Sequence, residues 1–130
     1  MGSNVTKKEI RVYLKERELE VVEGGKVMRT CDCLIGRSGH ETMPGRFRVL
    51  EKKIDKVSNK YKAPMPYSLK FDTDWKAIHQ SSNFFLRNLG MSLGVDDAGS
   101  HGCVGLAESD AKAVYEWAEV GTPVLIKKSR

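Results

Sequence analysis

Residues Ile10–Val22 read IRVYLKERELEVV, with apolar and polar side chains alternating on both sides of a charged middle segment. Alternation with a period of two puts every second side chain on one face of a β-strand. Two such runs joined by a short polar segment are typical of a β-hairpin. The sequence therefore predicts two antiparallel strands near its start.

The remaining strand signals are shorter and are separated by glycines, prolines and polar residues. Four segments have the composition or alternation of strands: Val27–Ile35, Phe47–Val49, Tyr67–Phe71 and Thr122–Lys127. A short apolar run, Ala77-Ile78, leads directly into His79. Ser58–Pro66 is polar and contains two prolines, so we interpret it as a loop.

Only one segment predicts a clear helix, and it follows Leu106. Ser109 is suited to the N-cap, Asp110 places a negative charge in the first turn, and Gly121 supplies the stop. Phe84–Gly90 is ambiguous and could form a short helical turn that Gly90 ends. The predicted fold class is thus mainly β with one helix (α+β).

Composition limits the class of protein. A chain of 130 residues corresponds to about one domain, which we place at residues 10–130, with residues 1–9 as a leader or cloning remnant. The balance of 40% hydrophobic and 30% charged residues is that of a globular protein and excludes a disordered or fibrous one. No apolar run approaches the roughly 20 residues that span a bilayer.

The positive charge is concentrated in one segment. Arg46–Lys62 contains seven basic and two acidic residues, so it accounts for the whole formal net charge of +5. Such a patch can steer an anionic partner. Lysines also protect edge strands from aggregation, so the segment has a second interpretation that involves no partner.

Gly99–Leu106, GSHGCVGL, places an imidazole two residues before a thiol between glycines. A cysteine becomes a nucleophile when an imidazole and backbone N–H groups stabilise its thiolate. The flanking glycines allow a sharp turn that brings amides close to a reacting carbonyl. Cys103 is therefore a candidate nucleophile, and the amides of His101, Gly102 and Cys103 are candidates for an oxyanion hole.

The residues alone leave other interpretations open. The proton acceptor for Cys103 could be His101, His79 or His40. A zinc site formed by His79, His101 and Cys103 is weaker, because no fourth ligand follows at a familiar spacing. Cys103 could also be an ordinary buried cysteine, which is our interpretation of the remaining two, Cys31 and Cys33.

Ser100–Val104, SHGCV, resembles the Ser/Thr-His-Gly-Cys-hydrophobic signature of the L,D-transpeptidases, the YkuD-like family. His79 is similar to the upstream histidine of that signature. Thr42–Phe47, TMPGRF, is similar to the Thr-Pro-x-Gly-x-Phe element of the family with one residue inserted. Pro64–Tyr67 and Gly121–Val124 are similar to two further family segments, and the resemblance extends from about Ile10 to Ile126.

The resemblance implies a β-sandwich-like L,D-transpeptidase fold and a chemistry. Cys103 would attack the third-residue carbonyl of a peptidoglycan stem tetrapeptide and release D-alanine. His79 would be its proton partner, oriented by a backbone carbonyl near Gln80. The implied residues are Cys103, His79 and His101 as catalytic, the amides of His101, Gly102 and Cys103 as oxyanion hole, and Tyr67, Gln80, Ser100 and Gly105 as substrate-binding. No metal or cofactor is implied.

The implied partners are peptidoglycan stem peptides, with anionic cell-wall polymers as a further class, and neither nucleic acid nor stable membrane insertion is expected. The implied location is extracytoplasmic, in the periplasm or cell wall, with the export signal absent from this sequence. Transfer of the acyl group to an amine would form a 3→3 crosslink, whereas transfer to water would make the protein an L,D-carboxypeptidase or related hydrolase. A non-catalytic binder of an anionic polymer is a third hypothesis.

The chain departs from the family pattern in two places. Gly105 stands where the family usually has Asn or Arg. The segment between His79 and Ser100 is also longer than usual, so residues 84–98 are expected to reshape the pocket.

Overall fold

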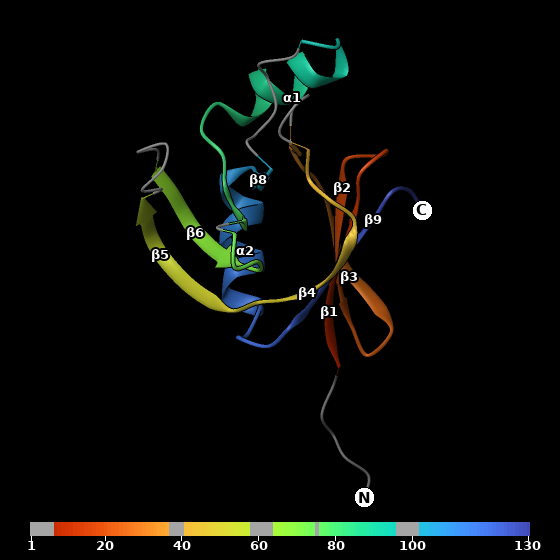
Figure 1. Cartoon of the computed structure of the whole chain (residues 1–130), viewed down its shortest axis with the longest axis vertical. Coiled ribbons are helices and arrows are strands. Elements are labelled where there is room, and N and C mark those ends of the chain that lie inside the picture. The colour runs from red at the N-terminus through yellow and green to blue at the C-terminus, as the bar shows by residue number, and fades with distance from the viewer. Residues whose placement is uncertain (1–6, 37–40, 58–63, 75, 96–101) are drawn as a thin grey trace, which may run out of the picture.

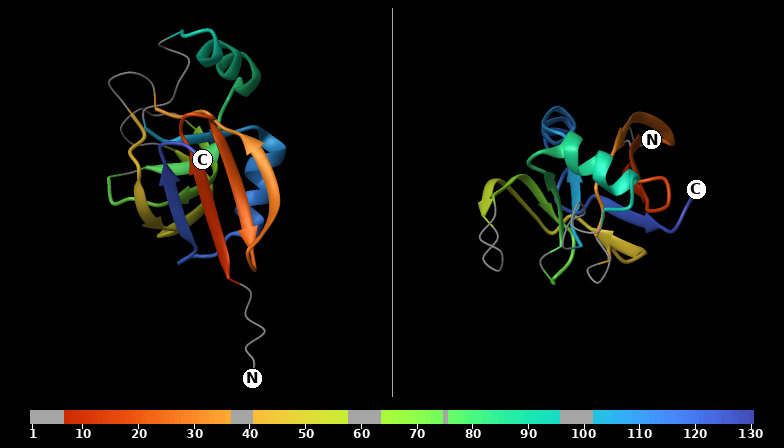
Figure 2. Two further views of the ribbon diagram at one scale, coloured as in Figure 1. Left: turned by 90° about the vertical axis from the view of Figure 1, so that its right-hand side faces the viewer. Right: turned by 90° about the horizontal axis from the view of Figure 1, so that it is seen from above.

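The computed structural model describes residues 7–36, 41–57, 64–74, 76–95 and 102–130. Over these residues the chain forms two β-sheets and two helices (Figure 1). The five-stranded sheet has the order β3-β2-β1-β9-β4. The left view of Figure 2 shows β9 (blue), β1 (red) and the orange strands β2 and β3 side by side. Its strands are β1 (Lys8–Tyr13), β2 (Glu18–Glu23), β3 (Lys26–Asp32), β4 (Gly45–Arg48) and β9 (Pro123–Lys127).

The second sheet has four strands in the order β5-β6-β7-β8. They are β5 (Glu51–Val57), β6 (Pro64–Lys70), β7 (Ala77–Gln80) and β8 (Val104–Leu106). β5, β6 and β7 are antiparallel neighbours, whereas β7 and β8 run parallel. The segment between β7 and β8 contains helix α1 (Phe84–Ser92), and helix α2 (Glu108–Trp117) follows β8.

The two sheets are joined at both edges. On one side β4 continues into β5 through Val49, whose N–H donates to Thr122 O at 2.9 Å, and Leu50, whose N–H donates to Lys70 O at 2.7 Å. On the other side the residues after β3 reach β8, where Leu34 and Gly105 exchange two backbone hydrogen bonds of 2.8 and 3.0 Å. The predicted β-sandwich-like, mainly β fold is confirmed.

The inner faces of both sheets and one face of α2 share a single hydrophobic core. The alternating residues predicted from Ile10–Val22 supply its first layer. The buried members include Ile10, Val12, Leu19, Val21, Leu69, Ile78, Val104, Leu106, Ala111, Val114, Val124 and Ile126. The two remaining cysteines, Cys31 and Cys33, are also buried and free, and burial raises the pKa of Cys31 to about 12.

The helices differ from the prediction in two respects. The ambiguous segment is a full second helix, α1, and Gly90 lies inside it instead of ending it. The other helix, α2, begins at Glu108, so Ser109 lies in its first turn and Ala107 occupies the N-cap. The reason is the short connection: β8 ends at Leu106, and only Ala107 remains between strand and helix.

Two strands were not predicted. β5 lies within the basic segment and is the edge strand of its sheet, as the interpretation without a partner expects. β8 has only three residues, which is too short for an alternating pattern. The prediction of a loop up to Pro66 is wrong at its end, because Pro64 and Pro66 pair with β5. β7 pairs with Leu69 and Lys70, at the other end of β6. The end that contains Pro64 and Pro66 is therefore bonded to β5 alone, and proline is tolerated at such a position.

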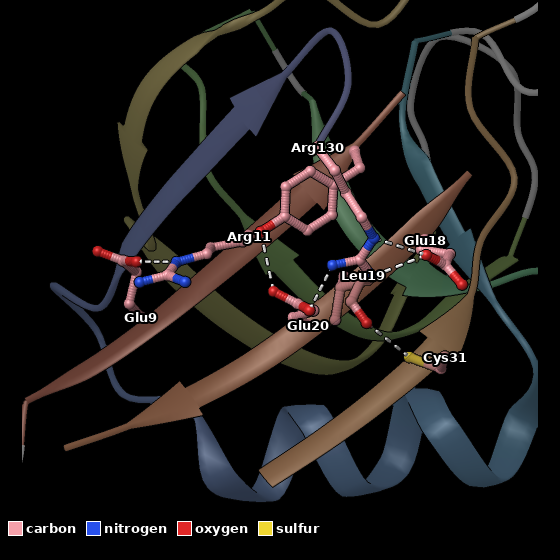
Figure 3. A network of polar contacts seen from close by, with 8 residues as sticks. Glu9, Arg11, Glu18, Leu19, Glu20, Cys31 and Arg130 are labelled. Atoms are coloured by element: carbon pink, nitrogen blue, oxygen red, sulfur yellow. Dashed lines mark hydrogen bonds and ion pairs between the residues drawn. The ribbon is translucent and has the colours of Figure 1, made fainter. Parts of the chain in front are cut away.

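A polar network covers the outer face of the five-stranded sheet (Figure 3). Glu20 is only 6% exposed, and its carboxylate accepts hydrogen bonds from Tyr13 Oη at 2.9 Å and Arg130 Nη1 at 2.8 Å. Arg130 also donates to Glu18 at 2.7 Å and lies over the Tyr13 ring. The hydrogen bond from Arg130 is the main reason that the pKa of Glu20 is lowered.

This network predicts a pH dependence of stability. A carboxyl group with a lowered folded pKa stabilises the fold above its unfolded pKa of about 4.3, and this contribution is lost as the pH falls through the folded pKa. In urea denaturation, we expect the stability of the wild type to fall more steeply below about pH 4.3 than that of Glu20→Gln. Glu116→Gln, at an exposed position on α2, should follow the wild type. Parallel profiles for wild type and Glu20→Gln would contradict this assignment.

Candidate active site

The parallel pairing of β7 with β8 brings together two residues that are distant in sequence. Ile78 is opposite Val104, and His79 is opposite Gly105. Ile78 and Val104 both face the core, so His79 on one strand and Cys103, directly before the other, share the opposite face of the sheet. From the spacing of strands and residues, the two Cα atoms lie roughly 8 Å apart, a distance that an imidazole and a thiol can bridge.

Cys103 is partly exposed, and its thiol is held by the neighbouring strand. The backbone N–H of Ala77, beside it on β7, donates a hydrogen bond to the sulfur. Burial raises the pKa of the Cys103 thiol, while the Ala77 amide and the Lys76 ammonium lower it, and burial is the largest of the three effects. At neutral pH the resting sulfur is therefore a thiol, not the anion expected from the sequence, and it needs a base.

His79 has the properties of that base. Its Nδ1 donates to the backbone carbonyl of Gln80 at 2.7 Å, which is the contact expected from the sequence and leaves Nε2 as the hydrogen-bond acceptor. Burial lowers the pKa of His79, the Gln80 carbonyl raises it, and the positive charge of Arg87 lowers it further. The net decrease keeps the imidazole neutral at pH 7, with Nε2 able to accept a proton.

The backbone before Cys103 is held from two sides. Gly102 has a φ of 103°, a conformation that favours glycine, and its carbonyl accepts a hydrogen bond of 3.0 Å from Thr42 Oγ1. The same hydroxyl accepts the N–H of Gly36 at 2.8 Å, and Thr42 is 6% exposed. With its carbonyl bonded in this way, the peptide group of Gly102 has a defined orientation beside the sulfur.

Gly105 has a packing role at this site. A Cβ atom at this position would lie 2.8 Å from Ser81 Cβ and 3.4 Å from Leu34 Cβ, so a side chain has no room. Both backbone polar groups of Gly105 are bonded to Leu34. A substrate-binding role for Gly105 stays a prediction, and a side chain such as Asn or Arg at this position would meet Ser81 and Leu34.

The other predicted substrate-binding residues have different surroundings. Tyr67, which has a φ of 55°, packs its ring against Tyr115 of α2 with centroids 5.7 Å apart, and its substrate-binding role stays a prediction. Gln80 supports His79 through its backbone and lines a cavity of about 370 Å³ whose other wall is the start of α1. Ser100, His101 and His40 lie outside the described residues.

Lys76 and Thr42 contribute to the site but were not predicted as functional residues. Thr42 was noted only as part of a family element, and Lys76, although it lies shortly before His79, belongs to no motif. Thr42 approaches Gly102 from a segment 60 positions away in sequence, and Lys76 from one 26 positions away. Only the pairing of β7 with β8 could have revealed Lys76.

Two further expectations concern the basic segment and metals. Lys52 donates to Ala118 O at 2.7 Å and lies over the Tyr115 ring, so it packs on α2, whereas Lys53 is exposed beside Glu51. Among the described residues, no cluster of His, Cys, Asp and Glu could hold a metal ion. Within the same residues, neither helix has the length and apolar character needed to cross a membrane.

Comparison with known proteins identifies a family. A model of the L,D-transpeptidase catalytic domain, YkuD, matches residues 7–126. No curated protein matches the chain. Among solved structures, an L,D-transpeptidase from Stackebrandtia nassauensis has 29% identity and a TM-score of 0.81, covering 100% of this chain and 59% of its own.

Two other structures are similar. A Cys-to-Ser variant of the Enterococcus faecium L,D-transpeptidase has 26% identity and a TM-score of 0.78, covering 93% of this chain and 50% of its own. L,D-transpeptidase 3 from Mycobacterium tuberculosis, in complex with a faropenem-derived adduct, has 16% identity and a TM-score of 0.77. It covers 94% of this chain and 60% of its own. This chain thus spans between half and three-fifths of the length of these proteins.

The steric role of Gly105 is testable. Gly105→Asn introduces the side chain usual in the family at a position with no space, so we expect the free energy of unfolding to decrease by about 1–3 kcal/mol. Chemical denaturation of Gly105→Ala, alone and with Ser81→Gly, isolates the contact. Gly105→Ala should lower the free energy of unfolding less in the Ser81→Gly background than in the wild type. Additive effects of the two substitutions would exclude the Ser81 contact as the cause of the destabilisation.

The position of Thr42 generates a second prediction. Thr42→Val keeps the shape but removes the hydroxyl between Gly36 and Gly102, so we expect a loss of about 1–3 kcal/mol of stability, measured by chemical denaturation. The rate of Cys103 alkylation should change as well, because the peptide beside the sulfur loses its support. Thr30→Val, at an exposed position on β3, is the matched control. Equal stability of the two variants would exclude the proposed role of Thr42.

Proposed function

Because the chain belongs to the L,D-transpeptidase catalytic-domain family, we propose that it is a cysteine acyltransferase that crosslinks peptidoglycan stem peptides. The observation that carries the proposal is the parallel pairing of β7 with β8, which brings a neutral His79 on β7 close to Cys103, the residue directly before β8. This pair has the proton acceptor and the nucleophile that acyl transfer requires.

In the proposed first half-reaction, His79 Nε2 accepts the proton of Cys103 as the sulfur attacks the third-residue carbonyl of a stem tetrapeptide. The negative charge moves to the carbonyl oxygen, where backbone N–H groups around Gly102 and Cys103 stabilise it, with His101 as a further predicted donor. The C–N bond then breaks, His79 returns the proton to the leaving amine, and D-alanine departs. A thioester on Cys103 remains.

In the second half-reaction, the amine of another stem attacks the thioester carbonyl. His79 accepts a proton from that amine, the C–S bond breaks, and the sulfur regains its proton. The product is a 3→3 crosslink. The substrate places this reaction in the periplasm or cell wall, where stem peptides are located, and anionic cell-wall polymers near the basic segment remain a further proposed partner.

The hydrogen bond from the Ala77 N–H to the Cys103 sulfur supports this assignment of roles. This hydrogen bond holds the sulfur next to β7. His79 lies two residues after Ala77 on the same strand, and in the proposed reaction it approaches the sulfur from there. The hydrogen bond to Gln80 takes the place of an acidic residue in orienting the imidazole, so no third side chain is required.

Two experiments test the function. Incubation with faropenem should add one covalent adduct to the wild type by mass spectrometry and none to Cys103→Ala. His79→Gln should keep the thiol but slow adduct formation by about 10²–10⁴-fold, because general-base catalysis is lost. Cys31→Ala, which removes a buried thiol, should still form the adduct.

Purified stem tetrapeptides then distinguish the outcomes of acyl transfer. Crosslinked dimers with release of D-alanine would support the transpeptidase, whereas tripeptides alone would assign the acyl group to water and the protein to the L,D-carboxypeptidases. Stem processing by Cys103→Ala would overturn both.

A further inference from the structure

We propose that Lys76 is the electrostatic partner of the Cys103 sulfur and promotes its ionisation, a role for which the chain shows no sequence signal. The inference rests on the proposed function only in taking Cys103 as the nucleophile. It concerns the charge beside the sulfur and is tested without any peptidoglycan substrate.

The first observation is the position of the Lys76 side chain. A Cβ atom on Gly102 would lie 2.8 Å from Lys76 Cε and 2.9 Å from Lys76 Nζ. The end of the lysine therefore lies directly against the backbone of the residue that precedes Cys103. The absence of a side chain at position 102 is what makes this approach possible.

The second observation is that the backbone holds Lys76 at this place. Lys76 precedes β7, and its carbonyl accepts the N–H of Phe71 at 3.0 Å, which closes the turn between β6 and β7. The next amide, Ala77 N–H, is the one that binds the sulfur. Consecutive residues thus supply two favourable interactions to a thiolate: a hydrogen bond from the Ala77 amide and the positive charge of Lys76.

The charges around the site leave this role to Lys76. Among the described residues, Lys76 is the charged side chain that lowers the pKa of Cys103. Asp74, which is 83% exposed, forms an ion pair with Lys76 at 3.9 Å and screens it only in part. Arg87 on α1 acts on His79, and His79 itself is neutral in the resting state.

The consequence is a sulfur that can be activated despite its burial. Burial favours the thiol, and a cation close to the sulfur reduces that preference most when the proton has left. Lys76 therefore stabilises the thiolate that forms when His79 accepts the proton. A charge next to Gly102 also lies close to the amides that receive the oxyanion.

The test measures the pH dependence of Cys103 alkylation by iodoacetamide, with the site of modification located by peptide mass mapping. In Lys76→Met we expect the apparent pKa of the reactive thiol to rise by about one unit, with roughly tenfold slower alkylation at pH 7. Lys76→Arg keeps the charge and should retain most of the wild-type profile. Lys26→Met, which removes an equal charge at the exposed start of β3, should not shift it.

Three outcomes would overturn the proposal. An unchanged profile in Lys76→Met would exclude any electrostatic role. Equal shifts in Lys76→Met and Lys76→Arg would assign the effect to packing against Gly102. An equal shift in Lys26→Met would assign it to net charge. Because alkylation needs no stem peptide, a failure of the transpeptidase assignment would appear separately, in the stem-peptide products.

Discussion

The site depends on one short parallel ladder, in which three residues of β7 pair with three of β8. Parallel strands require a crossover connection, so the pairing joins a histidine and a cysteine separated by the whole α1 segment. The alternation of side chains across the sheet then puts Ile78 and Val104 into the core and His79 and Cys103 on the opposite face. The core packing that stabilises the domain thus also determines that His79 and Cys103 share the other face of the sheet.

The local environment distributes the chemistry between these two residues. Burial disfavours charge on both, raising the pKa of the thiol and lowering that of the imidazole. Both shifts favour the neutral forms of the two side chains, a thiol and a neutral imidazole, and in the proposed reaction charge develops when the proton moves to His79. The Ala77 amide and the Lys76 charge are already in place around the sulfur. They can therefore stabilise the negative charge as it develops there, without any prior reorganisation.

The parts predicted from the sequence are those in which neighbouring residues carry the information. The alternation in Ile10–Val22 predicted β1 and β2. The resemblance carried by His79 and SHGCV predicted a base and a nucleophile, and the pairing of β7 with β8 now brings these two segments together. β5 was missed because EKKIDKV is an exposed edge strand without regular alternation. The N-cap was assigned to Ser109, but α2 already begins at Glu108, because only Ala107 separates it from β8. Lys76 could not be found in this way, since its position against Gly102 exists only after folding.

Gly105 and helix α1, the two places where the sequence was expected to depart from the family pattern, are connected physically. Without a side chain at Gly105, Ser81 can approach β8, where its N–H donates to Leu106 O at 2.9 Å. Ser81 Oγ in turn accepts a hydrogen bond of 2.8 Å from Arg87 on α1.

The far end of α1 is attached independently, because Arg17 donates to Asn88 Oδ1 and Ser92 Oγ, both at 2.6 Å. Arg87 is consequently held between two attachment points of its helix, close enough for its charge to lower the pKa of His79. The Ser81 contacts that Gly105 allows and the contacts of helix α1 thus form one unit, through which the helix acts on His79.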